Sequence, residues 1–265
     1  MLEIIKAIVL GIVQGITEWL PVSSTGHMIL VDEFLRLDMS AAFMDVFLVF
    51  IQLGSILAVV VVFWSYFASV FKGRREAIVL WLKVAVACVP AAVVGFLFDD
   101  RINELFFNFQ TVAAALIFYG IAFIVIEHRR PEARIVELEQ IGYKTALYIG
   151  MFQVLALIPG TSRSGATIIG ALLVGLSRPA AAKFSFFIAV PIMLGASVLR
   201  FARFDGMFTG VETAVMSAGF ITAFAVSLVA IKFLMEFVKK HTFKGFGVYR
   251  IVLGIVVLVY FWFSN

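Results

Sequence analysis

The sequence contains little charge and almost no cysteine. Only 14% of its 265 residues are charged and 63% are hydrophobic, whereas a soluble domain of this size would need far more charge to cover its surface. The single cysteine, Cys88, lies in an apolar segment, which excludes an internal disulfide and a thiolate metal site. The net charge is +4 and the basic residues are spread between the apolar segments, so nothing indicates nucleic-acid binding.

What the sequence has instead is a series of long apolar runs. Their lengths are close to the roughly 20 residues that a helix needs to cross the hydrocarbon core of a bilayer. The alternating pattern of a membrane β-barrel is absent, so we predict an all-α integral membrane protein. The helices are expected at residues 2–20, 27–36, 44–70, 77–98, 109–127, 143–158, 166–177, 179–200, 212–238 and 247–263.

Two polar segments interrupt these runs. The first break, residues 21–27, reads PVSSTGH, and the second break, residues 159–165, reads PGTSRSG. A bilayer core offers no water to backbone N–H and C=O groups, so irregular backbone survives there only when it is buried in protein or lines a polar cavity. The two breaks therefore indicate one buried binding or reaction site.

The basic loops predict the membrane topology. Segments 27–36 and 166–177 are too short to span, so each is expected to form a re-entrant hairpin with the helix before it, which leaves six spans. Three basic loops, at residues 72–75, 129–144 and 239–244, then fall on one side, which the positive-inside rule makes cytoplasmic. Both termini are then external. A full crossing by one hairpin would scatter the basic loops over both sides.

The two hairpins enter from opposite sides in this topology, which is typical of an inverted-topology repeat. We expect one polytopic domain, residues 1–265, whose halves, about 1–127 and 143–265, are joined by a cytoplasmic connection. A shift of 139 residues supports the repeat, since it aligns Gly11 with Gly150, Gln14 with Gln153, Ser23 with Ser162 and Gly26 with Gly165.

Glu18 lies deep in the first apolar run, one helical turn after Gln14. Residues four apart lie on one helix face, so both side chains can point at one target. A carboxylate among apolar residues is costly, which favours a functional role. The alternative is an acid at the membrane interface near the end of the helix.

His27 is the only histidine in an apolar stretch, and it follows the polar residues 23–26 at the start of a short helix. The start of a helix presents free N–H groups that favour anions. Histidine can also act as a general base or a nucleophile near neutral pH. The alternative is a hydrogen-bonded core residue without a chemical role.

Arg163 stands in the middle of the second break. Its permanently charged guanidinium needs an anionic partner, and the neighbouring Ser162, Ser164 and Gly165 supply hydroxyls and room for close backbone approach. An arginine beside backbone donors suits a phosphate. The alternative is a structural ion pair between Arg163 and Glu18. Both hold if the ion pair belongs to the empty state and the phosphate contact to the substrate-bound state.

Residues 14–27, QGITEWLPVSSTGH, and residues 159–167, PGTSRSGAT, closely resemble the two signatures of the undecaprenyl-diphosphate phosphatase family of the bacitracin-resistance type. Residues 51–55, IQLGS, are similar to a further family segment, and the resemblance extends from about residue 4 to the last apolar run. It implies a multi-pass protein of the bacterial cytoplasmic membrane whose site opens to the outside face. It also implies hydrolysis of the terminal phosphate of undecaprenyl diphosphate, which returns the monophosphate carrier to peptidoglycan synthesis and confers bacitracin resistance.

The resemblance implies roles for individual residues. Ser24 and His27 would be the nucleophile and the acid–base group, and Arg163 would clamp the phosphate. Glu18 and Gln14 would form the acidic motif and hold a divalent cation, Mg²⁺ or Ca²⁺. The other phosphate contacts would come from Ser23, Thr25, Ser162, Ser164, Gly165 and Thr167.

Two positions depart from the family pattern. The first motif position is often Glu where this chain has Gln14, and Leu48 stands where an acidic residue is expected. A glutamine oxygen can still bind a metal or hydrogen-bond a phosphate. Both changes nevertheless lower the negative charge available to a cation.

Several alternatives stay open. His27 could attack phosphorus in place of Ser24, and a homodimer is compatible with the sequence. Broken helices in an inverted repeat are also the architecture of secondary transporters, so the chain could flip lipid phosphates across the bilayer instead of hydrolysing them, or do both. A purely scaffolding protein in contact with membrane lipids would leave Glu18, His27 and Arg163 without a role.

Overall fold

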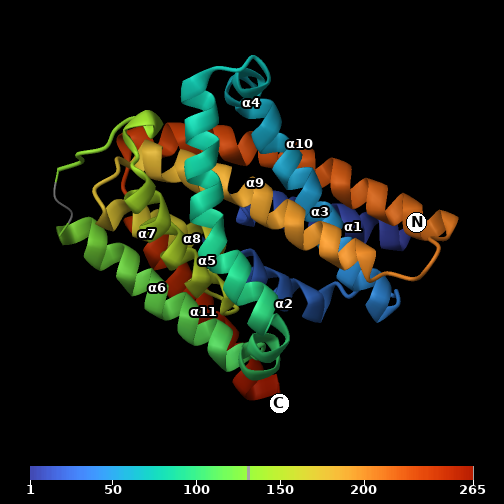
Figure 1. Cartoon of the computed structure of the whole chain (residues 1–265). Helices are drawn as coiled ribbons and strands as arrows, with labels where there is room; N and C mark the ends of the chain where they lie inside the picture. Colours follow the sequence, from blue (N-terminus) through green and yellow to red (C-terminus); the bar gives the residue numbers. More distant parts are fainter. Residues whose placement is uncertain (130–131, 265) are drawn as a thin grey trace.

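The computed structural model describes residues 1–129 and 132–264, and helices make up nearly all of the regular structure in these ranges (Figure 1). In chain order they are α1 (Leu2–Thr17), α2 (Ser24–Phe34), α3 (Ala41–Val62), α4 (Trp64–Phe71), α5 (Arg75–Phe106), α6 (Phe109–Arg129), η1 (Leu138–Gln140), α7 (Tyr143–Val154), η2 (Leu155–Leu157), α8 (Arg163–Leu173), α9 (Arg178–Ala202), α10 (Gly210–Lys240) and α11 (Lys244–Ser264).

Six of the described helices are long and apolar enough to cross a membrane, and they are the six predicted spans. They comprise α3, residues Arg75–Phe98 of α5, α6, α9, α10 and α11. The prediction of an all-α protein with six helices able to span a membrane is therefore confirmed. The helices α2 and α8, which follow the two breaks, have 11 residues each, so a straight crossing of the hydrocarbon core is out of their reach.

The two largest differences from the predicted helices are a break at residue 63 and the later end of α5. The run 44–70, expected as one helix, is divided at Phe63, whose ring packs against Phe186 and Phe187. No glycine or proline marks this point, so the division comes from tertiary packing. Helix α5, expected to end at residue 98, continues to residue 106. Its exposed last turns carry an Arg101–Glu104 ion pair of 2.9 Å with a spacing that supports helix.

The two short helices begin three residues earlier than predicted because serines cap them. Ser23 Oγ accepts a hydrogen bond from the Gly26 N–H at 3.3 Å, and Ser162 Oγ accepts one from the Gly165 N–H at 3.1 Å. Such caps satisfy free donors of the first turn. Both serines have positive φ, 74° and 72°, and no other described residue except glycine does. Strained backbone of this kind clusters at functional sites.

The helices of the two halves pack on each other. Helix α1 packs on α10, α7 packs on α5, and α6 packs along α11. Glycines allow two of these approaches, because a Cβ atom on Gly11 would lie 2.6 Å from the Gly219 carbonyl oxygen, and one on Gly150 would collide with the backbone of Ala87. Helix α8 lies inside the bundle, in contact with α6, α7 and α9 (Figure 1).

A buried acid near the end of α6 ties three helices together. Arg178, at the start of α9, donates to Glu127 of α6 at 2.7 and 2.9 Å. The backbone N–H of Phe243, just before α11, donates to the same carboxylate at 2.9 Å. These bonds fix the ends of α6, α9 and α11 relative to each other.

Candidate functional site

The two breaks meet at a cavity of about 190 Å³. Its walls come from the end of α1, the start of α2, helix α3, the segment before α8 and helix α9. The lining residues are Thr17, Glu18, Ser24, Thr25, Gln52, Ala156, Ile158, Gly160, Ser162, Arg163 and Met193. Polar groups from distant parts of the sequence thus line one cavity.

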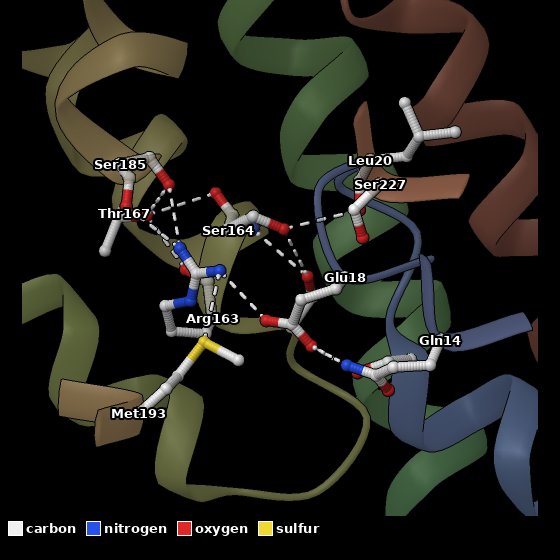
Figure 2. Close-up of polar contacts among 12 residues, drawn as sticks. Gln14, Glu18, Leu20, Arg163, Ser164, Thr167, Ser185, Met193 and Ser227 are labelled. Atoms are coloured by element: carbon white, nitrogen blue, oxygen red, sulfur yellow. Dashed lines mark hydrogen bonds and ion pairs between the residues drawn. The ribbon is translucent and has the colours of Figure 1, made fainter. Parts of the chain in front are cut away.

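Glu18 is the centre of the polar contacts at this cavity (Figure 2). Its Oε1 atom forms an ion pair with Arg163 Nη2 at 2.9 Å. Its Oε2 atom accepts hydrogen bonds from Gln14 Nε2 at 3.0 Å and from Ser24 Oγ at 3.3 Å. Only 7% of the Glu18 side chain and 12% of the Arg163 side chain are exposed. A buried ion pair needs this dense hydrogen bonding to offset the loss of hydration.

The guanidinium of Arg163 is held from several sides. Its Nη1 atom donates to the Ser185 carbonyl oxygen at 2.9 Å, and its Nη2 atom lies 3.9 Å from Met193 Sδ (Figure 2). The fully buried Trp19 ring stands 5.4 Å from the guanidinium carbon, within cation–π range. Nη1 is therefore bound to the scaffold, and Nη2 faces the cavity with Glu18 as its counter-ion.

The other hydroxyls of the second half serve mainly as structural partners. Ser164 Oγ donates to the Leu20 carbonyl oxygen at 3.3 Å, which connects the second half to the end of α1. Thr167 Oγ1 donates to the Arg163 carbonyl oxygen at 2.9 Å and lies 2.7 Å from Ser185 Oγ. Of the predicted phosphate contacts here, Ser162 lines the cavity, whereas Ser164, Gly165 and Thr167 are buried and do not.

In the first break, Ser24 and Thr25 line the cavity, and Ser23 is buried as the helix cap. His27 does not line it. Its Nδ1 atom lies 2.7 Å from the Ser23 carbonyl oxygen, and its Nε2 atom lies 2.7 Å from the Tyr249 hydroxyl. A carbonyl oxygen only accepts, so the proton sits on Nδ1. The partner of the Ser24 hydroxyl is Glu18 and not His27.

The family described as bacitracin resistance protein BacA matches residues 7–256, a range that includes both breaks. The chain belongs to this family. The resemblance seen in the sequence is therefore confirmed.

Curated BacA-type relatives match over nearly the whole chain. A protein named undecaprenyl-diphosphatase from Desulfitobacterium hafniense is 56% identical over 98% of this chain and 97% of its own. Undecaprenyl-diphosphatase 1 from Clostridioides difficile is 58% identical over 98% and 97%. An undecaprenyl-diphosphatase from Acetivibrio thermocellus is 54% identical over 98% of each chain.

The structure of this BacA-family chain adds residues that sequence reasoning missed. Gln52 lines the cavity from α3, and its side chain forms no hydrogen bond among the described residues. The Ser185 carbonyl oxygen accepts a hydrogen bond from Arg163, and the Tyr249 hydroxyl donates one to His27 Nε2. Arg250 lies fully buried in α11. Gln52 and Arg250 could have been found in the sequence, because each is a polar or charged residue inside a run that otherwise has the composition of a membrane span.

Proposed function

We propose that this chain is an undecaprenyl-diphosphatase of the bacterial cytoplasmic membrane. It hydrolyses the terminal phosphate of undecaprenyl diphosphate, which recycles the lipid carrier for peptidoglycan synthesis and confers bacitracin resistance. The observation that carries the proposal is the Glu18–Arg163 pair beside Ser24 at one cavity. Full-length relatives with this name support the substrate.

Phosphate binding in this proposal rests on Arg163. When the terminal phosphate enters, its oxygens replace Glu18 as the partner of Nη2, while Nη1 stays on the Ser185 carbonyl oxygen. The hydroxyls of Thr25 and Ser162 line the same space. The free N–H groups at the starts of α2 and α8 add further donors, as helix N-termini do for anions. These fixed groups stabilise charge on the reacting phosphate.

Ser24 is the nucleophile in this proposal. Its Oγ atom attacks the terminal phosphorus and gives its proton to Glu18, the one carboxylate within hydrogen-bond distance. The bond from that phosphorus to the bridging oxygen breaks, and undecaprenyl phosphate leaves. Water then cleaves the phosphoserine and releases phosphate. His27 supports the first break through the Ser23 carbonyl in this arrangement. Attack by His27 itself remains the alternative.

A divalent cation, Mg²⁺ or Ca²⁺, is part of the proposal. The described residues contain no group of three or more His, Cys, Asp or Glu side chains that could hold a metal. Mg²⁺ is commonly bound by one or two carboxylates together with substrate phosphates, and one carboxylate plus the amide oxygen of Gln14 fits that mode. Glu18 and Gln14 would hold the ion against the substrate. When bound, it supplies neutralisation of the phosphate charge.

The membrane arrangement we propose is an inverted repeat with two re-entrant hairpins, α1–α2 and α7–α8, and a site open to the external face. The matching caps at Ser23 and Ser162 support it, since these serines are 139 residues apart and share one unusual backbone conformation. The packing also supports it, because the first helix of each half, α1 or α7, packs on a long helix of the other half, α10 or α5. The homodimer that is compatible with the sequence stays a prediction.

Phosphate release from undecaprenyl diphosphate in detergent tests the proposal. The purified protein should release phosphate, release should fall in the presence of a chelator, and added Mg²⁺ or Ca²⁺ should restore it. A lipid-phosphate transporter, which the broken helices also suit, would release none. Transport in addition to hydrolysis would appear as movement of labelled undecaprenyl phosphate across vesicles that contain the protein.

A further inference from the structure

Arg250 is a buried charge without an acidic partner. The residue lies in the second turn of α11 and has no exposed surface. None of the ion pairs formed among the described residues includes it. An arginine at such a position is costly, and charged side chains inside membrane-spanning helices usually have a function.

The partners of Arg250 are backbone carbonyls from both breaks. Its Nη1 atom donates to the Pro21 carbonyl oxygen in the first break at 3.3 Å. Its Nη2 atom donates to the Gly160 and Thr161 carbonyl oxygens in the second break, each at 2.9 Å. One planar guanidinium therefore connects the two segments that line the cavity, with Nη1 bound to the first break and Nη2 to the second.

These carbonyls lie next to the reacting groups in the sequence. Pro21 is three residues after Glu18 and three before Ser24, and Thr161 is two residues before Arg163. The backbone at Gly160 is itself fixed, with φ at +89° and room for no Cβ atom, which would lie 2.6 Å from the Val112 carbonyl oxygen. Arg250 holds the Pro21 carbonyl and the Gly160 and Thr161 carbonyls at a fixed separation. Because these residues are only two or three positions from Glu18 and Arg163 in the chain, this separation also sets the 2.9 Å contact between Glu18 and Arg163.

We propose that Arg250 is a positioning residue for the phosphatase reaction. It does not line the cavity, and it acts by holding the first and second breaks at the separation that brings Ser24, Glu18 and Arg163 onto one phosphate. The inference rests on the proposed function. A misplacement of about 1 Å far from the chemistry can lower a rate by about 100-fold, so the effect is measurable.

The test compares Arg250→Lys with Arg250→Met. Lysine keeps the charge on a single ammonium, which is unable to reach both breaks at once. Methionine keeps much of the side-chain volume and removes the charge. We expect both variants to lower kcat by about 10- to 100-fold, with KM within about threefold of the wild-type value. Folding is measured in parallel as the midpoint of thermal unfolding in detergent. Lysine should remain folded even if methionine does not.

Arg178→Lys is the matched control, because Arg178 is also held in place at a helix interface but far from both breaks, by Glu127. It should change the unfolding midpoint and leave kcat per folded molecule unchanged. If Arg250→Lys keeps the wild-type kcat and Arg250→Met is slow, the charge of Arg250 is what matters, and the proposal that it positions the two breaks is overturned. A rise in KM alone would make it a substrate contact. An inactive wild-type protein would instead overturn the proposed function and this inference with it.

Discussion

Arg163 uses its two terminal nitrogens for two tasks. Nη1 binds the Ser185 carbonyl oxygen, which anchors the side chain, and Nη2 faces Glu18 and the cavity. Arg163→Lys keeps the charge but loses the planar geometry. Removal of one such contact typically costs about 100- to 1,000-fold in turnover. We therefore expect a loss of that size in phosphate release, with an unchanged unfolding midpoint. Near-normal turnover by Arg163→Ala would remove Arg163 from the reaction.

Ser24 and His27 are separated by their partners, and their variants distinguish their roles. Ser24 contacts Glu18 at the cavity, whereas His27 is bonded to Ser23 and Tyr249. If Ser24 attacks phosphorus, Ser24→Ala should lose nearly all turnover. If His27 transfers a proton, His27→Gln should be slower by about 100- to 10,000-fold. Both rates are measured at saturating metal.

Tyr249→Phe is the matched control for this pair, because it keeps the stacked ring and removes only the hydroxyl on His27 Nε2. A small effect of Tyr249→Phe beside a large effect of His27→Gln would show that the imidazole is needed and its bond to Tyr249 is not. Substantial turnover by Ser24→Ala, together with an acid-labile phosphohistidine, would make His27 the nucleophile.

The signature residues could be nominated from the sequence, but their partners could not. Glu18, Ser24 and Arg163 stand out because polar groups are rare in apolar runs. Ser185 binds Arg163 mainly through its carbonyl oxygen, which every residue has, and Arg250 donates its hydrogen bonds to backbone carbonyls. Contacts to backbone atoms leave no mark in the sequence pattern, so the groups that hold Arg163 and the breaks became visible only in three dimensions.

At the scale of the helices, glycine decides how closely α7 approaches α5. A Cβ atom on Gly150 would collide with the backbone of Ala87, and neither backbone can yield as a flexible side chain would. Gly150→Ala should therefore destabilise the protein by about 1–3 kcal/mol, as overpacking does. Chemical denaturation in mixed micelles measures the change.

The control for this prediction is Gly195→Ala, at a helical glycine that has open space around its would-be Cβ atom. It should leave stability unchanged or raise it slightly, since alanine favours helix by about 1 kcal/mol over glycine. An equal loss in both variants would mean that close packing at Gly150 does not limit stability.

Helix positions followed from the sequence more closely than helix ends. The six spans were predictable because length and apolar composition determine them. The division at Phe63 was not, since it depends on the rings of Phe186 and Phe187. The early starts of α2 and α8 depend on serines with positive φ. Such a conformation is unfavourable for serine in isolation, and only the surrounding structure maintains it.

The whole molecule offers a direct test of topology. Helix α5 runs from Arg75 to Phe106 as one continuous element, so its two ends should lie on opposite sides of the membrane. Arg74→Cys should be cytoplasmic and Ile102→Cys external, each in a Cys88→Ala background. An impermeant thiol reagent added to intact cells should label only residue 102. Labelling of both from outside would contradict the proposed inverted repeat.

Helices of each half pack on helices of the other half, and this suggests that the protein can be expressed as two fragments. Glu18 and Ser24 are encoded before the connection at residues 130–142, and Arg163 is encoded after it. Either fragment alone would lack part of the reaction centre. The first would leave uncovered the faces of α1 and α5 that pack on the second half, and the second would leave uncovered the matching faces of α10 and α7. The two fragments, translated separately in one cell, would have complementary surfaces. Their reassociation would restore activity that neither fragment carries.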